Sequence, residues 1–437
     1  MRYAAKIGAG LSLLAVTILW MVGRDTAPGG LAAAGRLAAL WSADLLLLQV
    51  VLMARVPWVE RAFGHDTLAR WHKWTGFTSF LLLLLHVGPA LVAYSRRDET
   101  DLLDETWRLL VAYRSMFWAF AALAALILVV VTSVRGVRRR MRYESWHLLH
   151  LYAYLGVAFA LPHELVLGSD FDRPIARAYW WTLYLAAAGS TVACRLGLPA
   201  WRTLRHRLAV DHVVEEAPGL VSVYLRGRRL DRLPARAGQF FVWRFLDGPG
   251  ALRGNPFSLS GPPRGDQLRI TVKTVGDGSR RVAALRPGTR ALIEGPYGRM
   301  TAATYSGGPI TMLACGVGVT PLLALLWDLP YGLGKATLVY RTRHPQEVAF
   351  VHELEWLAET RGVRLVPLVG PRSAAGSWLP AAYAEYDDAE ALLSLSPDIA
   401  GHDVFVCGPD PWTAAVFRAA RRAGVPTTRL HRERFGW

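Results

Sequence analysis

Histidine residues lie within long apolar runs in the first half of this 437-residue chain. His72 and His86 share one run, and His147, His150 and His163 share another. Ionisable side chains are costly inside a bilayer, so their presence there indicates a function. Because imidazole is a common axial ligand of haem iron, these histidines are candidate ligands of a redox cofactor held in a membrane.

The spacing within the first run suits two stacked haems better than one metal ion. His72 and His86 are 14 residues apart, which corresponds to about 21 Å of rise on a helix and to positions within roughly 40° of the same face. Two ligands on one face, a leaflet apart, would each serve a separate haem. The alternative is that these histidines cap helices or bond to other polar groups inside a helical bundle.

The second run supplies partner ligands less directly. His150 and His163 are 13 residues apart, which gives about 19 Å of rise but roughly 140° of rotation on an ideal helix. Pro162 precedes His163, and a proline kink or a local π-turn could re-aim that ring. His147 is an alternative ligand, although its offset from His163 is larger. If both runs are helices that run outward, His150 matches the depth of the first histidine of the other run, and His163 matches the second.

Two further ionisable residues, Arg36 and Asp44, fall in another apolar run. Arg36 lies near the expected outer end of that run, where it could pair with a haem propionate or an anionic acceptor. Snorkelling of its long side chain to the membrane surface is the alternative.

The second half of the chain contains a candidate flavin site. Asn255-Pro256-Phe257-Ser258 leads from a loop into an apparent strand, where an aromatic ring could lie beside a flavin and a hydroxyl could reach its reactive edge. Val272-Lys273 ends a strand that runs into a Gly-rich turn at Gly278-Ser279. A helix that begins at Ser279 would present free N–H groups to a pyrophosphate, whereas the alternative is a hairpin turn.

Three later segments are typical of a dinucleotide site. Gly316-Val317-Gly318-Val319-Thr320-Pro321 follows a strand and opens a helix, so its glycines would let a dinucleotide approach the helix N-terminus. Arg341 and Arg343 end the next strand, where a basic fork could hold a 2′-phosphate, which favours NADPH. Cys407-Gly408-Pro409 ends the last strand at the expected ligand edge of the sheet.

The elements that would hold these histidines are membrane spans. The chain is 52% hydrophobic and 19% charged, which excludes intrinsic disorder, and its 3 cysteines exclude a disulfide framework or a four-cysteine zinc site. An apolar run of about 20 residues can cross a bilayer. We expect six spans, at residues 7–22, 31–53, 68–94, 113–134, 145–167 and 175–196. The first run could instead be a signal peptide, since Arg2 and Lys6 precede a short apolar core.

The net charge of +16 is compatible at first with a nucleic-acid partner or with a membrane. The basic residues collect in the connector between the second and third runs, in the connector between the fourth and fifth, and after the sixth. Because Lys and Arg mark cytoplasmic connectors, both termini are predicted to be cytoplasmic. We therefore expect a multi-pass protein of the plasma (inner) membrane, in contact with the lipid bilayer and with no role in nucleic-acid binding.

The second half has the pattern of a soluble reductase. Short strand-like segments broken by Gly and Pro predict an antiparallel β-barrel, and strands that alternate with helices from about residue 307 predict a parallel sheet. The expected architecture is therefore an all-α six-helix transmembrane bundle followed by a barrel and an α/β Rossmann-like domain. The expected domains are a di-haem transmembrane domain at 1–202, an FAD-binding domain at 203–304 and an NADPH-binding domain at 305–437.

Together these residues resemble the NADPH oxidase and ferric reductase superfamily, in particular its compact bacterial NADPH-oxidase-like members. The resemblance covers nearly the whole chain and implies a ferric reductase-like transmembrane domain fused to a ferredoxin-NADP reductase-like module. It implies two b-type haems, FAD and NADPH. The family's ligand spacings of 14 and 13 select His150 over His147. The implied iron ligands are His72 and His150 for the inner haem, and His86 and His163 for the outer haem.

The resemblance also assigns the cytoplasmic motifs. The family's flavin motif, His or Arg followed by Pro, an aromatic residue and Ser or Thr, matches residues 255–258, with Asn255 in place of the usual first residue. Residues 272–273 and 278–279 match the segment that holds the FAD diphosphate, and residues 316–321 and 407–409 match the NADPH segments. The family commonly ends in an aromatic residue that covers the flavin, which implies Phe435 with Trp437 as the alternative.

The implied activity is transfer of electrons from cytosolic NADPH through FAD and the two haems to an acceptor outside. Oxygen, reduced to superoxide, is the favoured acceptor. Because histidines on both sides of each iron would leave no open position, the electron would be transferred at the haem edge. Ferric or cupric ions are the alternative acceptors, and a further alternative is a membrane subunit that gives electrons to a partner enzyme. A reductase anchored by a haem-free bundle is the remaining alternative. No calcium-binding hands or obligate regulatory subunit are expected.

Overall fold

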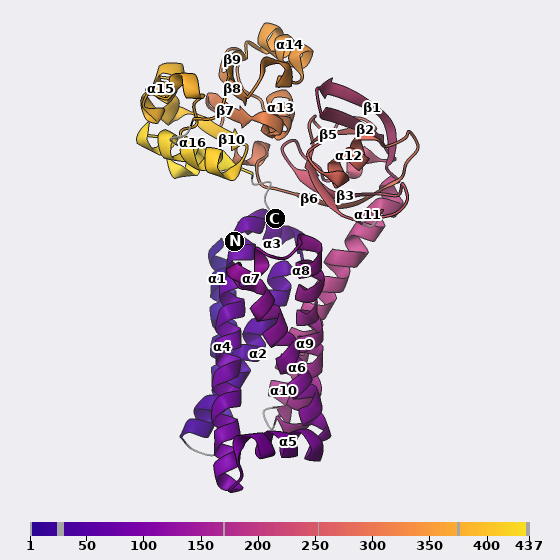
Figure 1. Cartoon of the computed structure of the whole chain (residues 1–437), viewed down its shortest axis with the longest axis vertical. Helices are drawn as coiled ribbons and strands as arrows, with labels where there is room; N and C mark the ends of the chain where they lie inside the picture. The colour runs from indigo at the N-terminus through magenta and orange to yellow at the C-terminus, as the bar shows by residue number, and fades with distance from the viewer. Residues whose placement is uncertain (1, 24–29, 169–170, 252, 374–375, 434–437) are drawn as a thin grey trace. The chain divides into compact units, whose positions relative to one another are not determined.

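The computed structural model describes residues 2–23, 30–168, 171–251, 253–373 and 376–433 (Figure 1). The chain forms two compact units, Met1–Arg195 and Leu196–Trp437. The first unit is helical and the second combines β-sheets with helices. The coarse prediction of a helical region followed by a sheet-containing reductase-like module is therefore confirmed.

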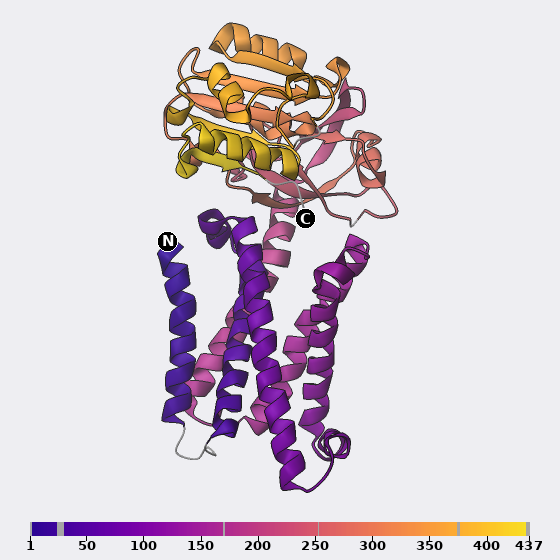
Figure 2. The same ribbon diagram turned by 60° about the vertical axis from the view of Figure 1, so that its left-hand side comes forward.

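Long helices form the first unit. They are α1 (Arg2–Val22), α2 (Leu31–Met53), α4 (His65–Arg97), α6 (Arg114–Ser133), α9 (Tyr152–Leu167) and α10 (Pro174–Thr191). Shorter helices connect them: α3 (Pro57–Phe63), α5 (Leu102–Ala112), α7 (Arg135–Arg138) and α8 (Tyr143–His150). Figures 1 and 2 show the long helices running side by side from two directions. Pairs of helices pack closely, with α2 against α4, α6 against α9, and α1 and α10 against α2.

Several of these helices have the length and composition of membrane spans. Within the described ranges, three segments are long and apolar enough to cross a bilayer: Ala33–Met53, Thr67–Arg97 and Arg114–Ser133. Ile7–Val22 is an apolar but shorter helix. The membrane-like character of the unit agrees with the sequence, while the number of six spans stays a prediction.

The run at 145–167 differs from the single helix that we expected. Helix α8 ends at His150, and α9 begins after Leu151 and continues through Pro162. The interruption therefore lies directly after His150. It is a single residue, and Leu151 keeps right-handed helical angles of φ −65° and ψ −19°.

The second unit begins with α11 (Leu198–His206), which continues from α10 through the π-helical turn η3 (Val192–Gly197). Helix α11 packs against β6 (Ala291–Tyr297), and the backbone N–H of Ile293 donates to Thr203 Oγ1 at 3.2 Å. The compact units divide at Arg195, and the extent of 1–202 for the membrane domain stays a prediction.

Two antiparallel sheets enclose a core in the first part of this unit. One has the order β1 (Ala209–Ala217), β2 (Leu220–Arg226) and β5 (Gln267–Lys273). The other has the order β4 (Asn255–Ser258), β3 (Phe240–Phe245) and β6. Alternate residues of these strands, such as Val223, Phe241, Trp243 and Ile270, are buried between them. Helix α12 (Asp277–Ala283) follows β5.

A parallel five-stranded sheet forms the rest. Its strands are β7 (Ile310–Cys315), β8 (Ala336–Thr342), β9 (Arg364–Val369), β10 (Asp403–Cys407) and β11 (Leu430–Arg432). Its helices are α13 (Val319–Asp328), α14 (Val351–Arg361), α15 (Asp388–Leu395) and α16 (Asp410–Arg422). The strand order is β11-β10-β7-β8-β9, so the chain proceeds from β7 to one side and returns with β10 on the other. Ligands of such sheets bind at this switch point, outside the carboxyl ends of the strands.

Candidate functional site

The helical unit brings the predicted histidines together in pairs. His72 on α4 and His150 at the end of α8 have ring centres 5.9 Å apart, with their planes inclined by 64°. His163 on α9 lies within electrostatic range of His86 on α4. The pairing by depth that we expected from the sequence is therefore the arrangement of the rings.

One face of α2 supports the two histidines of α4. Gln49 presents its backbone oxygen 3.3 Å from His72 Nδ1, and His86 is hydrogen-bonded to the backbone of Gly35. Between them, Ser42 Oγ donates to the Ser79 carbonyl at 2.8 Å, and Ser79 Oγ donates to the Ser42 carbonyl at 3.1 Å. The contacting positions are thus seven residues apart on both helices, and they ascend along α2 while they descend along α4.

These contacts orient the histidine rings in the way that metal ligands require. A ligating histidine usually donates its second ring N–H to a carbonyl or a hydroxyl, which fixes the tautomer and directs the other nitrogen at the metal. The Gln49 carbonyl can take that role for His72 Nδ1, which would leave Nε2 free to coordinate a metal.

The histidines of the facing helices are supported unequally. His150 Nδ1 lies 3.2 Å from Ser133 Oγ at the end of α6. His163 Nδ1 is buried and has no hydrogen-bond partner among the residues that the structure describes. The second ring nitrogens of His150 and His163 therefore have different surroundings.

The geometry of the inner pair fits a haem. Two metal–imidazole bonds of about 2 Å on opposite sides of one ion place the nitrogens about 4 Å apart and the ring centres about 6 Å apart. The 5.9 Å between His72 and His150 agrees with this value. Helix α4 packs closely on α2. In the described part of the chain, no cluster of three or more His, Cys, Asp or Glu side chains could hold an ion alone.

The opposite face of α2 carries a second polar cluster. Asp44 Oδ1 accepts hydrogen bonds from Ser12 Oγ of α1 at 2.7 Å and from the Tyr179 hydroxyl of α10 at 3.1 Å. Asp44 is only 1% exposed, and its Oδ2 has no partner within the described residues. Arg36 is half-buried and follows Gly35, so it lies at the level of His86.

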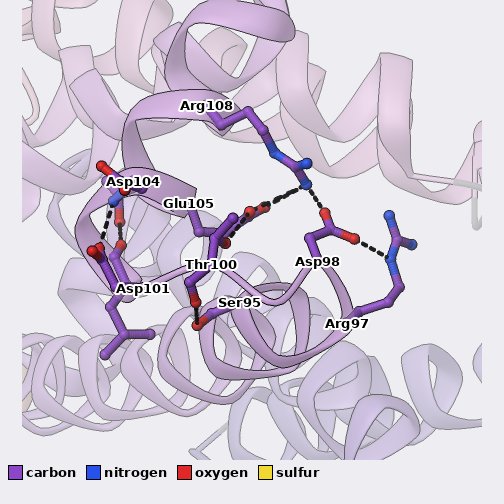
Figure 3. A network of polar contacts seen from close by, with 10 residues as sticks. Ser95, Arg97, Asp98, Thr100, Asp101, Asp104, Glu105 and Arg108 are labelled. Atoms are coloured by element: carbon purple, nitrogen blue, oxygen red, sulfur yellow. Dashed lines mark hydrogen bonds and ion pairs between the residues drawn. The ribbon is translucent and has the colours of Figure 1, made fainter.

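A polar network fixes the turn at the His86 end of α4 (Figure 3). Glu105 of α5 is fully buried, and it accepts from Thr100 Oγ1 at 3.0 Å and pairs with Arg108 at 3.1 Å. Arg108 also pairs with Asp98, which follows α4 directly. Asp101 caps α5 by accepting the backbone N–H groups of residues 103 and 104.

A hollow of about 380 Å³ lies near this end of the bundle. Its walls combine polar groups and aromatic rings from the start of α6 with apolar residues from the end of α9. It is lined by Ala112, Tyr113, Arg114, Ser115, Trp118, Pro162, Val166 and Leu167. Since Pro162 directly precedes His163, a small molecule in this hollow would lie close to the second histidine pair.

In the second unit, the two predicted flavin segments meet. Asn255 Oδ1 lies 3.0 Å from the position that a Cβ on Gly278 would take, and both residues line a hollow of about 170 Å³. Ser258 is 4% exposed, and its Oγ has no hydrogen-bond partner in the described ranges. A buried hydroxyl without a partner at the end of β4 fits a group that bonds to the flavin edge. Phe257 is half-buried beside it.

The Gly-rich turn after β5 leads into a helix, which excludes the hairpin alternative. Helix α12 begins at Asp277, and Ser279 Oγ accepts the backbone N–H groups of Val275 and Gly276 at 3.0 Å. The Ser279 side chain therefore closes the turn. At the end of β5, Val272 is buried, and Lys273 is exposed with Nζ 3.7 Å from Glu347.

The two predicted dinucleotide segments meet at the switch point of the parallel sheet. The turn at Gly316–Gly318 follows β7, and Cys407-Gly408-Pro409 follows the neighbouring strand β10. A Cβ on Gly318 would collide with the Cys407 carbonyl, and one on Gly408 would lie 2.8 Å from Cys315 Cβ. Helix α13 begins at Val319, ahead of the expected Pro321. Thr320 is buried and donates to the Val317 carbonyl at 2.9 Å.

The two arginines of the expected phosphate fork differ in position. Arg341 is 5% exposed, and its guanidinium donates to the carbonyls of Thr342 and Pro371. Burial lowers the pKa of Arg341, although it remains far above neutrality. Arg343 is exposed at the same end of β8. In this arrangement Arg343, rather than both arginines together, is accessible to a phosphate.

Cys407 is fully buried, and burial raises the pKa of its thiol well above the usual value. Such a thiol stays protonated at neutral pH and is inert as a nucleophile. At the end of β10, Cys407 therefore packs against the turn at Gly316–Gly318.

After the C-terminal strand β11, the chain contacts the end of β6, in the sheet β4-β3-β6. Strand β11 pairs in parallel with β10, and Glu433 Oε2 accepts the backbone N–H of Arg299 at 3.3 Å, just after β6. Phe435 and Trp437, the expected flavin-covering residues, lie outside the described residues.

The residues that support the histidines were not predicted from the sequence. The signal was present, because Gly35, Ser42 and Gln49 repeat every seven residues, as do His72 and Ser79. Ser133 gave no comparable signal, because its contact with His150 depends on how α6 and α8 cross. A half-buried Glu164, which accepts a hydrogen bond from the Tyr184 hydroxyl at 2.6 Å, was also missed.

Comparison with known proteins matches both halves of the chain. Residues 38–161 match the family described as "Ferric reductase like transmembrane component". The ferredoxin reductase component of 3-ketosteroid-9-alpha-monooxygenase from Mycolicibacterium smegmatis is 31% identical over 238 residues, which cover 52% of this chain and 65% of that protein. The glycine betaine monooxygenase reductase subunit from Pseudomonas aeruginosa is 26% identical over 245 residues, which cover 54% of this chain and 66% of that protein.

Among solved structures, the Amycolatopsis cytochrome P450 reductase GcoB aligns with 53% of this chain and 69% of its own, at 22% identity and a TM-score of 0.43. The chain spans just under two thirds of the length of the relatives that it matches.

Proposed function

Because this chain joins a ferric reductase-like transmembrane component to a reductase module homologous to ferredoxin reductase components, we propose that it transfers electrons from NADPH through FAD and two b-type haems across a membrane. The relatives of the module are oxidoreductases, and so is this chain. The observation that carries the haem proposal is the pairing of His72 with His150 at 5.9 Å, with Nδ1 of His72 already directed at a backbone carbonyl.

Four histidines would hold the haems in this proposal. His72 and His150 are the ligands of the inner haem, and His86 and His163 are those of the outer haem. Bound haem would supply one-electron chemistry at two depths of the bundle. The chain's own contribution is to hold each ring in one orientation, which Gln49 and Gly35 do from α2.

In the reductase module, the proposed FAD site comprises residues 255–258, 272–273 and 278–279, of which Asn255 and Gly278 line the hollow. Bound FAD would supply the conversion of a hydride into single electrons. The unpartnered Ser258 hydroxyl would bond to its reactive edge, and Phe257 would contact the ring. Phe435 is the proposed covering ring, with Trp437 as the alternative.

The proposed NADPH site is the switch point formed by residues 316–321 and 407–409. Gly318 has no side chain to keep the nucleotide from the backbone, and the start of α13 presents its N–H groups there. Arg343 is the proposed contact for the 2′-phosphate, and buried Arg341 would shape the strand end behind it.

We propose six membrane spans with both termini in the cytoplasm of a plasma (inner) membrane. Exposed arginines between α6 and α8 support this orientation, because basic connectors stay on the cytoplasmic side. The domains proposed on this basis are 1–202 for the haems, 203–304 for FAD and 305–437 for NADPH.

Oxygen is the proposed acceptor, with superoxide as the product. With a histidine on each face of both irons, an acceptor would take its electron at the haem edge. The hollow between α6 and α9, beside Pro162 and His163, gives a small acceptor such a position, and Arg36 lies at the same level as His86. Ferric or cupric ions are the alternative acceptors at this place.

A second candidate function is electron donation to a partner enzyme outside. It is favoured by the relatives, which are named as reductase components of monooxygenase systems. Purified protein that reduces its haems with NADPH, but that turns over with neither oxygen nor metal ions, would favour this candidate.

The decisive experiment is a dithionite-reduced minus oxidised absorbance spectrum of the purified protein. Two b-type haems are expected, and His72→Ala and His163→Ala should each remove about half of the signal. A spectrum without haem bands would refute the transmembrane path. Superoxide-dismutase-sensitive dye reduction, compared with Fe(II) formation under argon, then separates oxygen from metal ions as the acceptor.

A further inference from the structure

The four proposed haem ligands differ in how their second ring nitrogens are bonded. His72 Nδ1 faces the Gln49 carbonyl at 3.3 Å, and His150 Nδ1 faces Ser133 Oγ at 3.2 Å. His86 is bonded to the backbone of Gly35, whereas the buried Nδ1 of His163 has no partner among the described residues. The inner pair is thus fully supported, and the outer pair is supported on one side.

The bonding of the second nitrogen controls how strongly a histidine donates to iron. A ligand that gives its Nδ1–H to an oxygen becomes more basic, and a more basic ligand favours the oxidised, more positive iron. Full support therefore lowers the reduction potential of a haem, and loss of one acceptor raises it.

We propose that Ser133 is a positioning residue that keeps the inner haem at a lower reduction potential than the outer haem, whose ligand His163 lacks such an acceptor. Electrons would then move downhill from the cytoplasmic level of the bundle to the outer level. This inference rests on the proposed function, because it requires a haem at each histidine pair.

Ser133 is suited to this role by its place in the bundle. It is the last residue of α6, while His150 is the last residue of α8, so one short contact joins the ends of two helices. The preceding residue, Thr132, also carries a hydroxyl, but it bonds to the carbonyls of Leu128 and Val129 within its own helix. The two adjacent hydroxyls therefore form a matched pair, of which only one reaches a histidine.

The size of the effect follows from ligand support in other metal sites. Loss of such a partner typically changes metal-site equilibria by about 10- to 100-fold. We expect Ser133→Ala to shift the electron distribution between the two haems about tenfold toward the inner haem, which is about 59 mV for a one-electron couple.

The test is a potentiometric titration of the haem absorbance of the purified full-length protein. Two one-electron transitions are expected, and His72→Ala should abolish the lower one. In Ser133→Ala the lower transition should move up while the upper one stays in place. Ser133→Thr, which retains the hydroxyl, should restore the original potential, and Thr132→Val should move neither transition.

The outcomes separate this inference from the function on which it rests. Protein purified without haem overturns both. Two haems whose potentials are unchanged in Ser133→Ala overturn the inference alone, as does a lower transition that His163→Ala abolishes instead of His72→Ala. If Ser133→Ala loses its haem, Ser133→Cys provides the measurement, because a thiol is a weaker acceptor and should give a smaller shift in the same direction.

Discussion

The two glycines of the turn after β7 are expected to be irreplaceable for different physical reasons. Gly318 has an ordinary helical φ of −61°, but a Cβ there would collide with the backbone of Cys407 and Gly408. Gly316 has open space around it, but its φ is +55°. An L-residue in that left-handed region costs about 1–2 kcal/mol, unless it is Asn or Asp.

Gly318→Ala must therefore displace either the glycine turn or the connection from β10 to α16. Such overpacking costs about 1–3 kcal/mol. If the displacement disturbs the proposed NADPH site by the same amount, binding should weaken by about 5- to 140-fold. Gly318→Asn should weaken NADPH binding more than Gly318→Ala does, because the Asn side chain is larger. At Gly316 the order should reverse, since Asn tolerates the left-handed region better than Ala.

The assay is the dependence of flavin reduction on NADPH concentration in all four variants, in parallel with thermal unfolding of each. At each position, the KM for NADPH of the Asn variant is divided by that of the Ala variant. This ratio cancels any effect on KM that is shared by both substitutions at that position. Gly318→Ala protein with an unchanged KM for NADPH would refute the packing argument. If Gly316→Asn raises the KM for NADPH more than Gly316→Ala does, the argument from the left-handed φ of Gly316 is refuted.

Two further predictions concern stability. Burial raises the pKa of Asp403, but hydrogen bonds from Ser306 and His431 outweigh it, so the carboxyl has a pKa below its usual value. Its stabilising contribution is then present at neutral pH and is lost as the pH falls through this lowered pKa, and Asp403→Asn should abolish that acid dependence of the melting temperature. Glu105→Ala removes the buried acceptor of Thr100 and one of the two carboxylates that pair with half-exposed Arg108, and it should cost about 1 kcal/mol, seen as faster hydrogen exchange across α5 with no change in the second unit.

The sequence predicted the elements of this protein well where periodicity decides them. The long apolar runs became helices, and residues 316–321 and 407–409 meet because parallel strands end at one edge. The 14-residue spacing predicted that His72 and His86 share one helix, and both lie on α4. In these cases local spacing and topology suffice.

Other features depend on how the elements cross, and spacing does not record that. The one-residue interruption at Leu151 was not expected, because the sequence pointed to Pro162 as the site of re-aiming, and α9 continues through Pro162. Arg341 looked like half of a phosphate fork, yet its guanidinium turned inward to two carbonyls. A charged residue at a strand end can meet either solvent or the backbone, and only the neighbouring loop decides which.

The two faces of α2 connect a buried carboxylate to the proposed haem ligands. Lipid gives little hydrophobic drive for helices to associate, so polar contacts and close packing must set their orientation. Ser42 faces α4 in the same row as the backbone groups that hold His72 and His86. Asp44, two residues later and thus about 200° around the helix, bonds to α1 and α10. Rotation of α2 would break both sets of contacts together, so the Asp44 cluster stabilises the direction in which the histidine rings point.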